Sequence, residues 1–332
     1  MSSNNDNNNR MAMPRIGFGT FFSDENNMKK IKNAIDESFE IGYNAYDCAE
    51  MYQSTKAVGE RIATKPRELL WITSKLIGIP NDTDDNYTIL KKRVEDHLEQ
   101  LGGLKYVDLL LIHFPGKKEI DLGGSTPEKV KEDATFQWFD ENIDQGWKNM
   151  VRLRKDGLCR NIGISNFYQK HLDRLLKCPS VDITKEENNM PFANEIYVDP
   201  THPEFNFVEY MQSLKIKVIA YRSLAFLPVI QMASQMGDVT YSKLDALKEE
   251  EGHKSIHETI IKWLISRDIY VLVKSTSKDH LSANYSAVAD TDDATKAMNY
   301  DKQIFGPSEM VLTCGGTDEY ADVFKSISLE KE

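Results

Sequence analysis

The sequence predicts an α/β protein, a (β/α)₈ TIM barrel with long loops on its C-terminal face. Short apolar runs of strand length alternate with amphipathic helical segments along the chain. Eight such runs can be counted, and repeated β–α units imply parallel strands with right-handed crossovers. Polar, ionisable residues stand at the ends of several runs, where parallel barrels hold their functional groups. A doubly wound open sheet is the alternative.

The first half of the chain supplies four of the expected strands, at 15–20, 44–47, 69–75 and 107–113. Helices are expected between them at 28–41, 56–63 and 84–101. The first of these has apolar residues at helical spacing, including Ile31 and Ile35, and Gly42 suits its C-cap.

The second half continues the alternation after a long irregular stretch over 116–145. Loops of this length in compact domains are usually functional or disordered. The remaining strands are expected at 161–165, 193–198, 217–221 and 270–273. The remaining helices are expected at 147–155, 168–176, 203–214 and 255–266.

Composition restricts the class of protein. The chain has 332 residues and a net charge of −11, which argues against nucleic acid or an anionic membrane as a main partner. Its four cysteines show no CxxC spacing, which indicates a reduced, cytoplasmic protein. Residues 1–10 are mostly Asn and Ser, so we expect a disordered segment rather than a signal peptide, followed by one domain over 11–332. A monomer is the default.

Four ionisable residues at strand ends suggest proton-transfer chemistry. Asp47, Lys75 and His113 each end an expected strand, and Tyr52 follows Asp47 after a short loop. Negative charge that develops on an oxygen in a transition state needs a proton or hydrogen-bond donor. A phenol is a weak acid, but a nearby ammonium stabilises the phenolate, and a carboxylate keeps that ammonium charged. The competing interpretation is a buried ion pair beside a Tyr and a His that merely line the barrel mouth.

Other motifs carry less information. Gly17-Phe18-Gly19 lacks the third glycine of a dinucleotide fingerprint and indicates close backbone at the mouth of the first strand. His253 and His257 share a helical face, but no third ligand is suggested, so we expect a solvated surface and no metal. Cys48 should face away from Asp47 and pack in the core. Lys274-Ser275-Thr276 follows the last strand, where barrels frequently bind phosphate.

Several ordered motifs resemble the aldo-keto reductase family. They are the runs 42–52 (GYNAYDCAEMY), 72–76 (ITSKL), 106–115 (YVDLLLIHFP) and 157–167 (GLCRNIGISNF), and the similarity extends from Ile16 to Asn284. The resemblance implies a (β/α)₈ barrel, a nicotinamide cofactor and reduction of a carbonyl to an alcohol. It implies that Tyr52 is the general acid, that Asp47 and Lys75 tune it, and that His113 orients the carbonyl.

The same resemblance implies the binding residues. Ser165 and Asn166 would hold the carboxamide, Tyr221 would stack on the nicotinamide, and Lys274 with Ser275 would meet the adenosine phosphate. The full set implied for the cofactor is Gly19, Thr20, Ser165, Asn166, Glu195, Tyr221, Arg222, Ser223, Leu224, Lys274, Ser275, Thr276, His280 and Asn284. An apolar substrate pocket is expected from Phe21, Phe22, Phe114, Trp138 and Phe305. Lys274 favours NADPH, with NADH as a possible second cofactor.

The sequence also departs from the family pattern. Glu195 stands where Gln is usual, and a carboxylate there would add negative charge beside the nicotinamide and favour the oxidised cofactor. Arg222 replaces a small Ser, and His280 and Ala283 replace an expected Arg and an acidic residue. Ser54-Thr55 replaces the usual Asn-Glu after the tyrosine.

These departures keep other functions open. A cofactor-binding barrel that senses redox state or serves as a regulatory subunit, without catalysis, is one alternative, although the four intact catalytic candidates count against it. The same site run as an alcohol dehydrogenase in a biosynthetic pathway is another.

Overall fold

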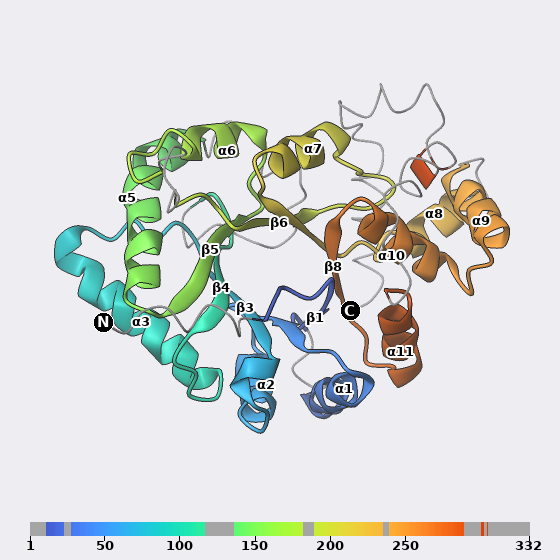
Figure 1. The fold of residues 1–332 in the computed structure, drawn as a ribbon, viewed down its shortest axis with the longest axis horizontal. Helices are drawn as coiled ribbons and strands as arrows, with labels where there is room; N and C mark the ends of the chain where they lie inside the picture. Colours follow the sequence, from blue (N-terminus) through green and yellow to red (C-terminus); the bar gives the residue numbers. More distant parts are fainter. Residues whose placement is uncertain are drawn as a thin grey trace.

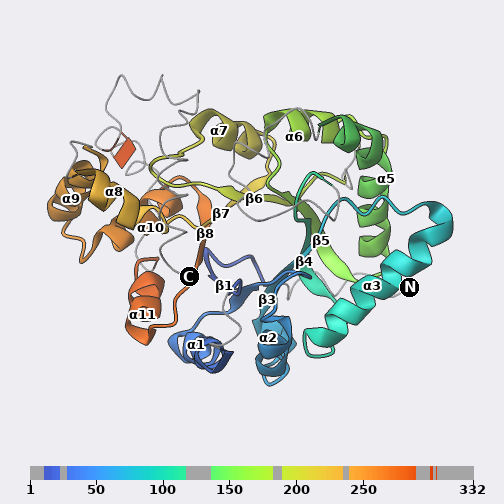
Figure 2. The same cartoon turned by 180° about the vertical axis from the view of Figure 1, so that it is seen from behind.

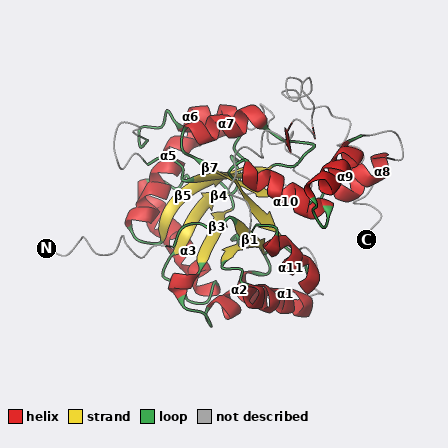
Figure 3. Ribbon diagram, turned by 45° about the vertical axis from the view of Figure 1, so that its right-hand side comes forward, coloured by secondary structure: helices red, strands yellow, loops and turns green. Residues whose placement is uncertain are grey.

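The computed structural model describes residues 11–22, 28–116, 136–181, 189–234, 239–288, 300, 301 and 304. Eight parallel strands close into a barrel in sequence order, because β8 pairs with β1. Figure 1 shows the strands at the centre with helices around them, and Figure 3 shows the same ring by secondary structure. The closed barrel confirms the predicted fold and excludes the open doubly wound sheet.

The strands are short and all parallel to their neighbours. They are β1 (Ile16–Gly19), β2 (Ala45–Asp47), β3 (Trp71–Leu76), β4 (Val107–Ile112), β5 (Cys159–Ser165), β6 (Ala193–Tyr197), β7 (Lys217–Tyr221) and β8 (Ile269–Val273). The helices that cover them are α1 (Met28–Ile41), α2 (Thr55–Ile62), α3 (Tyr87–Gln100), α5 (Phe136–Lys155), α6 (Gln169–Leu175), α7 (Phe205–Ser213), α10 (Ile256–Ser266) and α11 (Lys278–Ser286). Two further helices, α8 (Leu227–Ser234) and α9 (Thr240–Glu251), stand outside the ring on one side, as both opposite views show (Figures 1 and 2). Two 3₁₀ turns, η3 (Arg67–Leu69) and η4 (Asp84–Asn86), complete the elements.

The barrel interior changes character along its axis. An apolar cluster of Ala45, Trp71, Leu109, Leu111, Ala193 and Ile219 fills the N-terminal part, with Met11 and Met13 packed against it. Side chains alternate in and out along a strand, so positions two residues further on also point inward. Asp47, Glu195 and Lys75 therefore lie on the inner face above the apolar layer.

Helix α5 corrects one sequence expectation. The stretch 116–145 was expected to be irregular throughout, but α5 begins at Phe136 and buries Phe139, Ile143 and Trp147 at helical spacing. Gly146 lies inside this helix, where it serves packing. A Cβ at this position would lie 2.2 Å from Ile79 Cγ2, so only glycine lets the helix approach that closely. Helices α8, α9 and α11 were also not predicted.

Candidate active site

Lys75 is the centre of the candidate site and is fully buried. Its Nζ donates to Asp47 Oδ1 at 2.5 Å, to the Cys48 carbonyl at 3.3 Å and to the Tyr52 hydroxyl at 3.4 Å. Glu195 Oε1 lies 3.2 Å from the same Nζ. The structure thus brings the predicted acid, phenol and amine together, and it adds a second carboxyl group to them.

The electrostatics of Tyr52 differ from the sequence expectation. Lys75 favours the phenolate as predicted, but burial is the larger effect, and the net result is a raised pKa for Tyr52. Burial disfavours charge on Lys75 too, yet Asp47 and Glu195 outweigh it and raise the Lys75 pKa well above its usual value. These shifts favour a protonated phenol and a charged amine.

His113 contributes a neutral imidazole. Burial, reinforced by the charge on Lys75, lowers the pKa of His113 well below its usual value. Its ring packs edge-on against Tyr52 at 5.9 Å between centroids and stacks on Phe114 at 4.4 Å. Within the described chain its Nδ1 atom is buried and has no hydrogen-bond partner. A neutral ring with a free nitrogen beside the phenol can take part in a hydrogen bond to a substrate oxygen.

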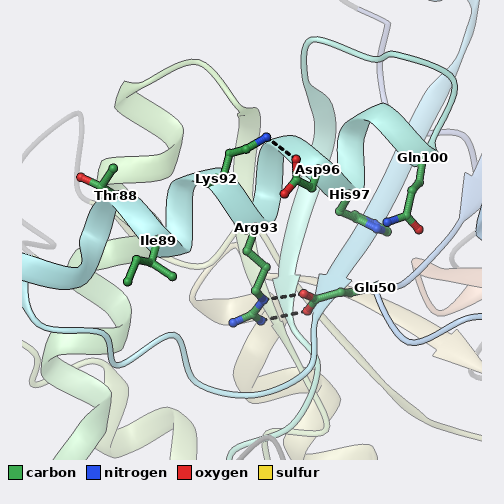
Figure 4. Close-up of a pocket in the computed structure, with 8 residues that line it drawn as sticks. All are labelled: Glu50, Thr88, Ile89, Lys92, Arg93, Asp96, His97 and Gln100. Atoms are coloured by element: carbon green, nitrogen blue, oxygen red, sulfur yellow. Dashed lines mark hydrogen bonds and ion pairs between the residues drawn. The ribbon is translucent and has the colours of Figure 1, made fainter.

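The loop that carries Tyr52 is held from the outside by α3. Arg93 on α3 donates from both Nε and Nη2 to the carboxylate of Glu50, the Nη2 contact being 2.8 Å (Figure 4). The other face of the loop is held by backbone, because Glu50 N donates to Lys75 O at 3.0 Å and Ile77 N donates to Glu50 Oε2 at 3.2 Å. Glu50 was part of the recognised motif, but the sequence suggested no role for it.

Ser54 and Thr55, which depart from the family pattern, also tie this loop. The hydroxyl of Ser54 donates to the Thr20 carbonyl. The hydroxyl of Thr55 donates to the carbonyl of Tyr52 at 2.7 Å. Both contacts fix the backbone next to the phenol.

A hollow of about 550 Å³ lies beside the Glu50–Arg93 pair, on the outer side of the barrel. It is lined by Glu50, Thr88, Ile89, Lys92, Arg93, Asp96, His97 and Gln100 (Figure 4). None of the predicted site residues lines it, so it is distinct from the candidate active site.

Four of the predicted cofactor residues form one hydrogen-bonded group at the ends of β5, β6 and β7. Asn166 has a left-handed backbone, with φ of 60°, and its Nδ2 donates to the carbonyl of His113 at 2.9 Å. The Tyr221 hydroxyl donates to Asn166 Oδ1 at 2.6 Å, and the Ser165 hydroxyl donates to the carbonyl of Glu195 at 2.9 Å. The group directly adjoins the Lys75 cluster.

Glu195 does not behave as the free carboxylate that the sequence suggested. Burial, reinforced by the charge of Asp47, raises its pKa well above the usual value, against the opposing effect of Lys75. This shift favours the neutral form of the carboxyl group. The expected negative charge beside the nicotinamide is thus opposed by the surroundings of Glu195.

The remaining cofactor candidates lie at the ends of β1, β7 and β8. Arg222 has φ of 57° and acts electrostatically on Lys274, whose Nζ donates to the carbonyl of Phe21 at 2.9 Å. Ser223 is buried, and its hydroxyl has no partner within the described chain. Gly19 ends β1, buried Thr20 follows it, and half-buried Leu224 comes shortly after β7. Half-buried Ser275 and exposed Thr276 follow β8, and exposed His280 and buried Asn284 lie on α11.

Two of the five substrate residues lie against catalytic candidates. The Phe21 ring is 49% exposed and lies 5.2 Å from the Tyr52 ring, and Phe114 stacks on His113. Phe22 packs against the core. Trp138 lies in the first turn of α5 rather than in a loop, and Phe305 lies outside the described residues.

Other sequence expectations concern cysteine, metal and membrane. Cys48 is buried in the main core, as predicted. Among the described residues there is no group of three His, Cys, Asp or Glu side chains that could hold a metal ion. Within the same residues, no helix combines the length and apolarity required to cross a membrane.

Comparison with known proteins identifies the family. The model of the Aldo/keto reductase family matches residues 15–299. The chain belongs to the aldo/keto reductase family. It is thus an oxidoreductase of the class that acts on carbonyl groups.

Individual relatives agree with this assignment. The D/L-glyceraldehyde reductase of Hypocrea jecorina is 28% identical over 302 residues, which cover 86% of this chain and 84% of the relative. The crystal structure of the Bombyx mori aldo-keto reductase AKR2E4 in complex with NADP superposes with a TM-score of 0.66 at 25% identity, covering 88% of this chain and 89% of the other. The crystal structure of MGS-M4, an aldo-keto reductase from a Medee basin deep-sea metagenome library, gives a TM-score of 0.66 at 26% identity. The match covers 90% of this chain and 94% of the other.

Proposed function

We propose that this protein is an NADPH-dependent reductase that converts an aldehyde or ketone to an alcohol, with Tyr52 as the general acid. The observation that carries the proposal is the contact of Lys75 Nζ with both Asp47 and the Tyr52 hydroxyl, beside the neutral His113. A reduced nicotinamide supplies a hydride to the carbonyl carbon. The protein must then stabilise and protonate the oxygen.

The residues at the barrel mouth fit such a cofactor. Ser223 and His113 offer buried polar atoms without partners in the described chain, and Arg222 and Lys274 place two cations at the ends of β7 and β8. Asn166 and Ser165 would hold the carboxamide, Tyr221 would stack on the ring, and the two cations would bind a 2′-phosphate. The NADP complex of the Bombyx mori relative supports this choice.

The chain's own groups divide the acid chemistry among them. Tyr52 donates its proton to the substrate oxygen, and Lys75 stabilises the resulting phenolate. Asp47 keeps Lys75 charged and in place. His113, held neutral by burial, hydrogen-bonds to the same oxygen. Phe21 and Phe114 favour apolar or aromatic carbonyl substrates, because both rings adjoin these groups.

The first test is NADPH oxidation, followed by absorbance, with a panel of aromatic and aliphatic aldehydes. Tyr52→Phe should abolish turnover and leave NADPH binding, measured by fluorescence, within about threefold of wild type, because only the transferable proton is removed. Undiminished turnover in Tyr52→Phe would show that Tyr52 is not the general acid. Tight NADPH binding without turnover of any substrate would favour the redox-sensor alternative.

A further inference from the structure

The cluster around Lys75 contains one more acid than base. Asp47 and Glu195 lie 2.5 Å and 3.2 Å from Lys75 Nζ, and all three residues are at most 4% exposed. With both carboxyl groups ionised, the cluster would hold a net negative charge in a buried site. Burying an uncompensated charge is costly, and proteins commonly avoid it by binding a proton.

The positions of the two carboxyl groups and their unpartnered oxygens indicate where such a proton lies. Asp47 Oδ1 and Glu195 Oε1 both contact the same atom, Lys75 Nζ, so the two carboxyl groups lie close to each other. Among the described residues, no donor reaches Asp47 Oδ2 or Glu195 Oε2, although both atoms are buried. An ionised carboxylate can only accept hydrogen bonds, whereas a protonated carboxyl group can also donate one, so a single proton between the two groups can bridge them. One shared proton satisfies both groups and makes the cluster neutral.

We propose that Glu195 and Asp47 share one proton in the resting enzyme, and that Glu195 uses it to restore the phenol of Tyr52 through Lys75 after each reduction. This inference rests on the proposed reductase function for its second part only. Glu195 is thereby a positioning and proton-storing residue, distinct from Tyr52, which meets the substrate.

The proton steps balance without any further reactant. Tyr52 loses its O–H proton to the product alkoxide and becomes a phenolate. An N–H bond of Lys75 breaks as the Tyr52 O–H bond forms again, and the Glu195 O–H bond breaks as Lys75 regains its proton. Glu195 is left as a carboxylate, and solvent supplies the next proton after product release. No electrons are exchanged in these steps, since the hydride has already reached the carbon.

The surroundings of Glu195 are consistent with this role. The titratable groups that act on it or respond to it are Asp47 from β2, Lys75 from β3, Tyr52 from the β2–α2 loop and Tyr221 from β7. Lys75 supplies the only positive charge among these four groups. Burial raises the pKa of Glu195 accordingly. A cavity of about 20 Å³, lined by residues that include Asp47, Thr73 and Glu195, adjoins both carboxyl groups and has room for a single water.

The shared proton is tested in the cofactor-free protein by infrared spectroscopy. We expect a carboxylic-acid C=O band at neutral pH that shifts when glutamate is ¹³C-labelled and is lost in Glu195→Gln. Glu50→Gln is the matched control and should keep the band, because Arg93 lowers the pKa of Glu50 despite burial and holds it ionised. Absence of the band from wild type would overturn the shared proton, and this measurement needs neither the variant nor activity.

The return of the proton to Tyr52 is tested in a single turnover with NADPH, followed by the ultraviolet absorbance of tyrosinate. In Glu195→Gln we expect a tyrosinate signal that persists at least tenfold longer than in wild type. Equal signals in the two proteins would overturn the relay. If wild type turns over no carbonyl substrate, the reductase proposal fails instead, and the infrared result still decides whether the proton is shared.

Discussion

Replacing Arg93 by Ala should loosen the loop that carries Tyr52 without touching the reacting groups. The Arg93 guanidinium clamps both oxygens of Glu50, two residues before the phenol. Both partners are mostly buried, with side chains 21% and 17% exposed. Removing the cation leaves a poorly solvated carboxylate, so the variant loses more than a surface contact.

The expected cost follows from that burial. Losing one partner of a fully buried ion pair costs about 3–5 kcal/mol, and an exposed pair contributes about 0–1 kcal/mol. For this partly buried, doubly hydrogen-bonded pair we expect a loss of about 2–3 kcal/mol of unfolding free energy. A small displacement of the phenol should also lower kcat by about tenfold, with KM within about twofold.

The neighbouring Lys92 provides a matched control on the same helix. It pairs with Asp96 at the surface, where the two side chains are 67% and 56% exposed. Lys92→Ala should therefore cost about 0.5 kcal/mol or less and leave kcat unchanged. Urea unfolding and steady-state kinetics on both variants make the comparison.

The stability loss in Arg93→Ala should depend on pH in a definite direction. Arg93 is the main cause that lowers the pKa of Glu50 in the folded state, against burial. Stability from a lowered carboxyl pKa is present above the unfolded value of about 4.3 and is lost as the pH falls through the folded value. The difference between wild type and Arg93→Ala should thus be largest at neutral pH and shrink below about pH 4. Equal, small effects of Arg93→Ala and Lys92→Ala at pH 7 would refute the clamp.

Three further predictions concern packing, cofactor choice and pH. Gly146→Ala should destabilise the protein by about 1–3 kcal/mol because its Cβ meets Ile79, and Ile79→Ala should be less harmful in that background than alone; additive urea-unfolding energies would contradict the contact. Lys274→Ala should raise KM for NADPH about tenfold to a hundredfold and leave KM for NADH within twofold, since a charge-assisted hydrogen bond to phosphate contributes about 1.5–3 kcal/mol; equal increases would argue against a 2′-phosphate contact. The pKa of Glu195 is raised in the folded state, so its contribution to stability is full below about pH 4.3. Above that pH the contribution declines by about 1.4 kcal/mol per pH unit, up to the folded pKa. Plots of unfolding free energy against pH that run parallel for Glu195→Gln and wild type from pH 5 to 7 would count against the raised pKa.

The sequence predicted the barrel because its strands are short, apolar and separated by helices of regular period. It also predicted that Asp47, Lys75 and His113 would meet, because parallel strands end on one side of a barrel. The contact between Lys75 and Glu195 could not be predicted from the sequence, because β3 and β6 are not neighbouring strands. A distance across the barrel interior depends on how all eight strands close. The clamp of Glu50 by Arg93 was missed for a similar reason, since a helix contributes its partner from outside the barrel.

The sequence-based prediction of helix α5 failed for a different reason. Its apolar residues Phe139, Ile143 and Trp147 carry the helical period, but the first two of them were included in the irregular stretch expected over 116–145. The need for glycine arises from the close approach of Ile79, which belongs to a segment far away in the sequence. Trp138 was consequently assigned to a loop over the substrate pocket, whereas it lies on a helix.

The layering of the barrel interior separates the parts that can vary from those that cannot. The apolar layer, with Met11 and Met13 packed against it, involves none of the catalytic candidates, while the charged layer lies at the opposite end. If the proposed function is correct, loops at the mouth are the part to exchange with those of relatives to redirect specificity, with the inward residues of β2, β3 and β6 kept. For protein engineering, the apolar N-terminal half of this barrel is the part to keep, and the loops at the C-terminal rim are the part to replace.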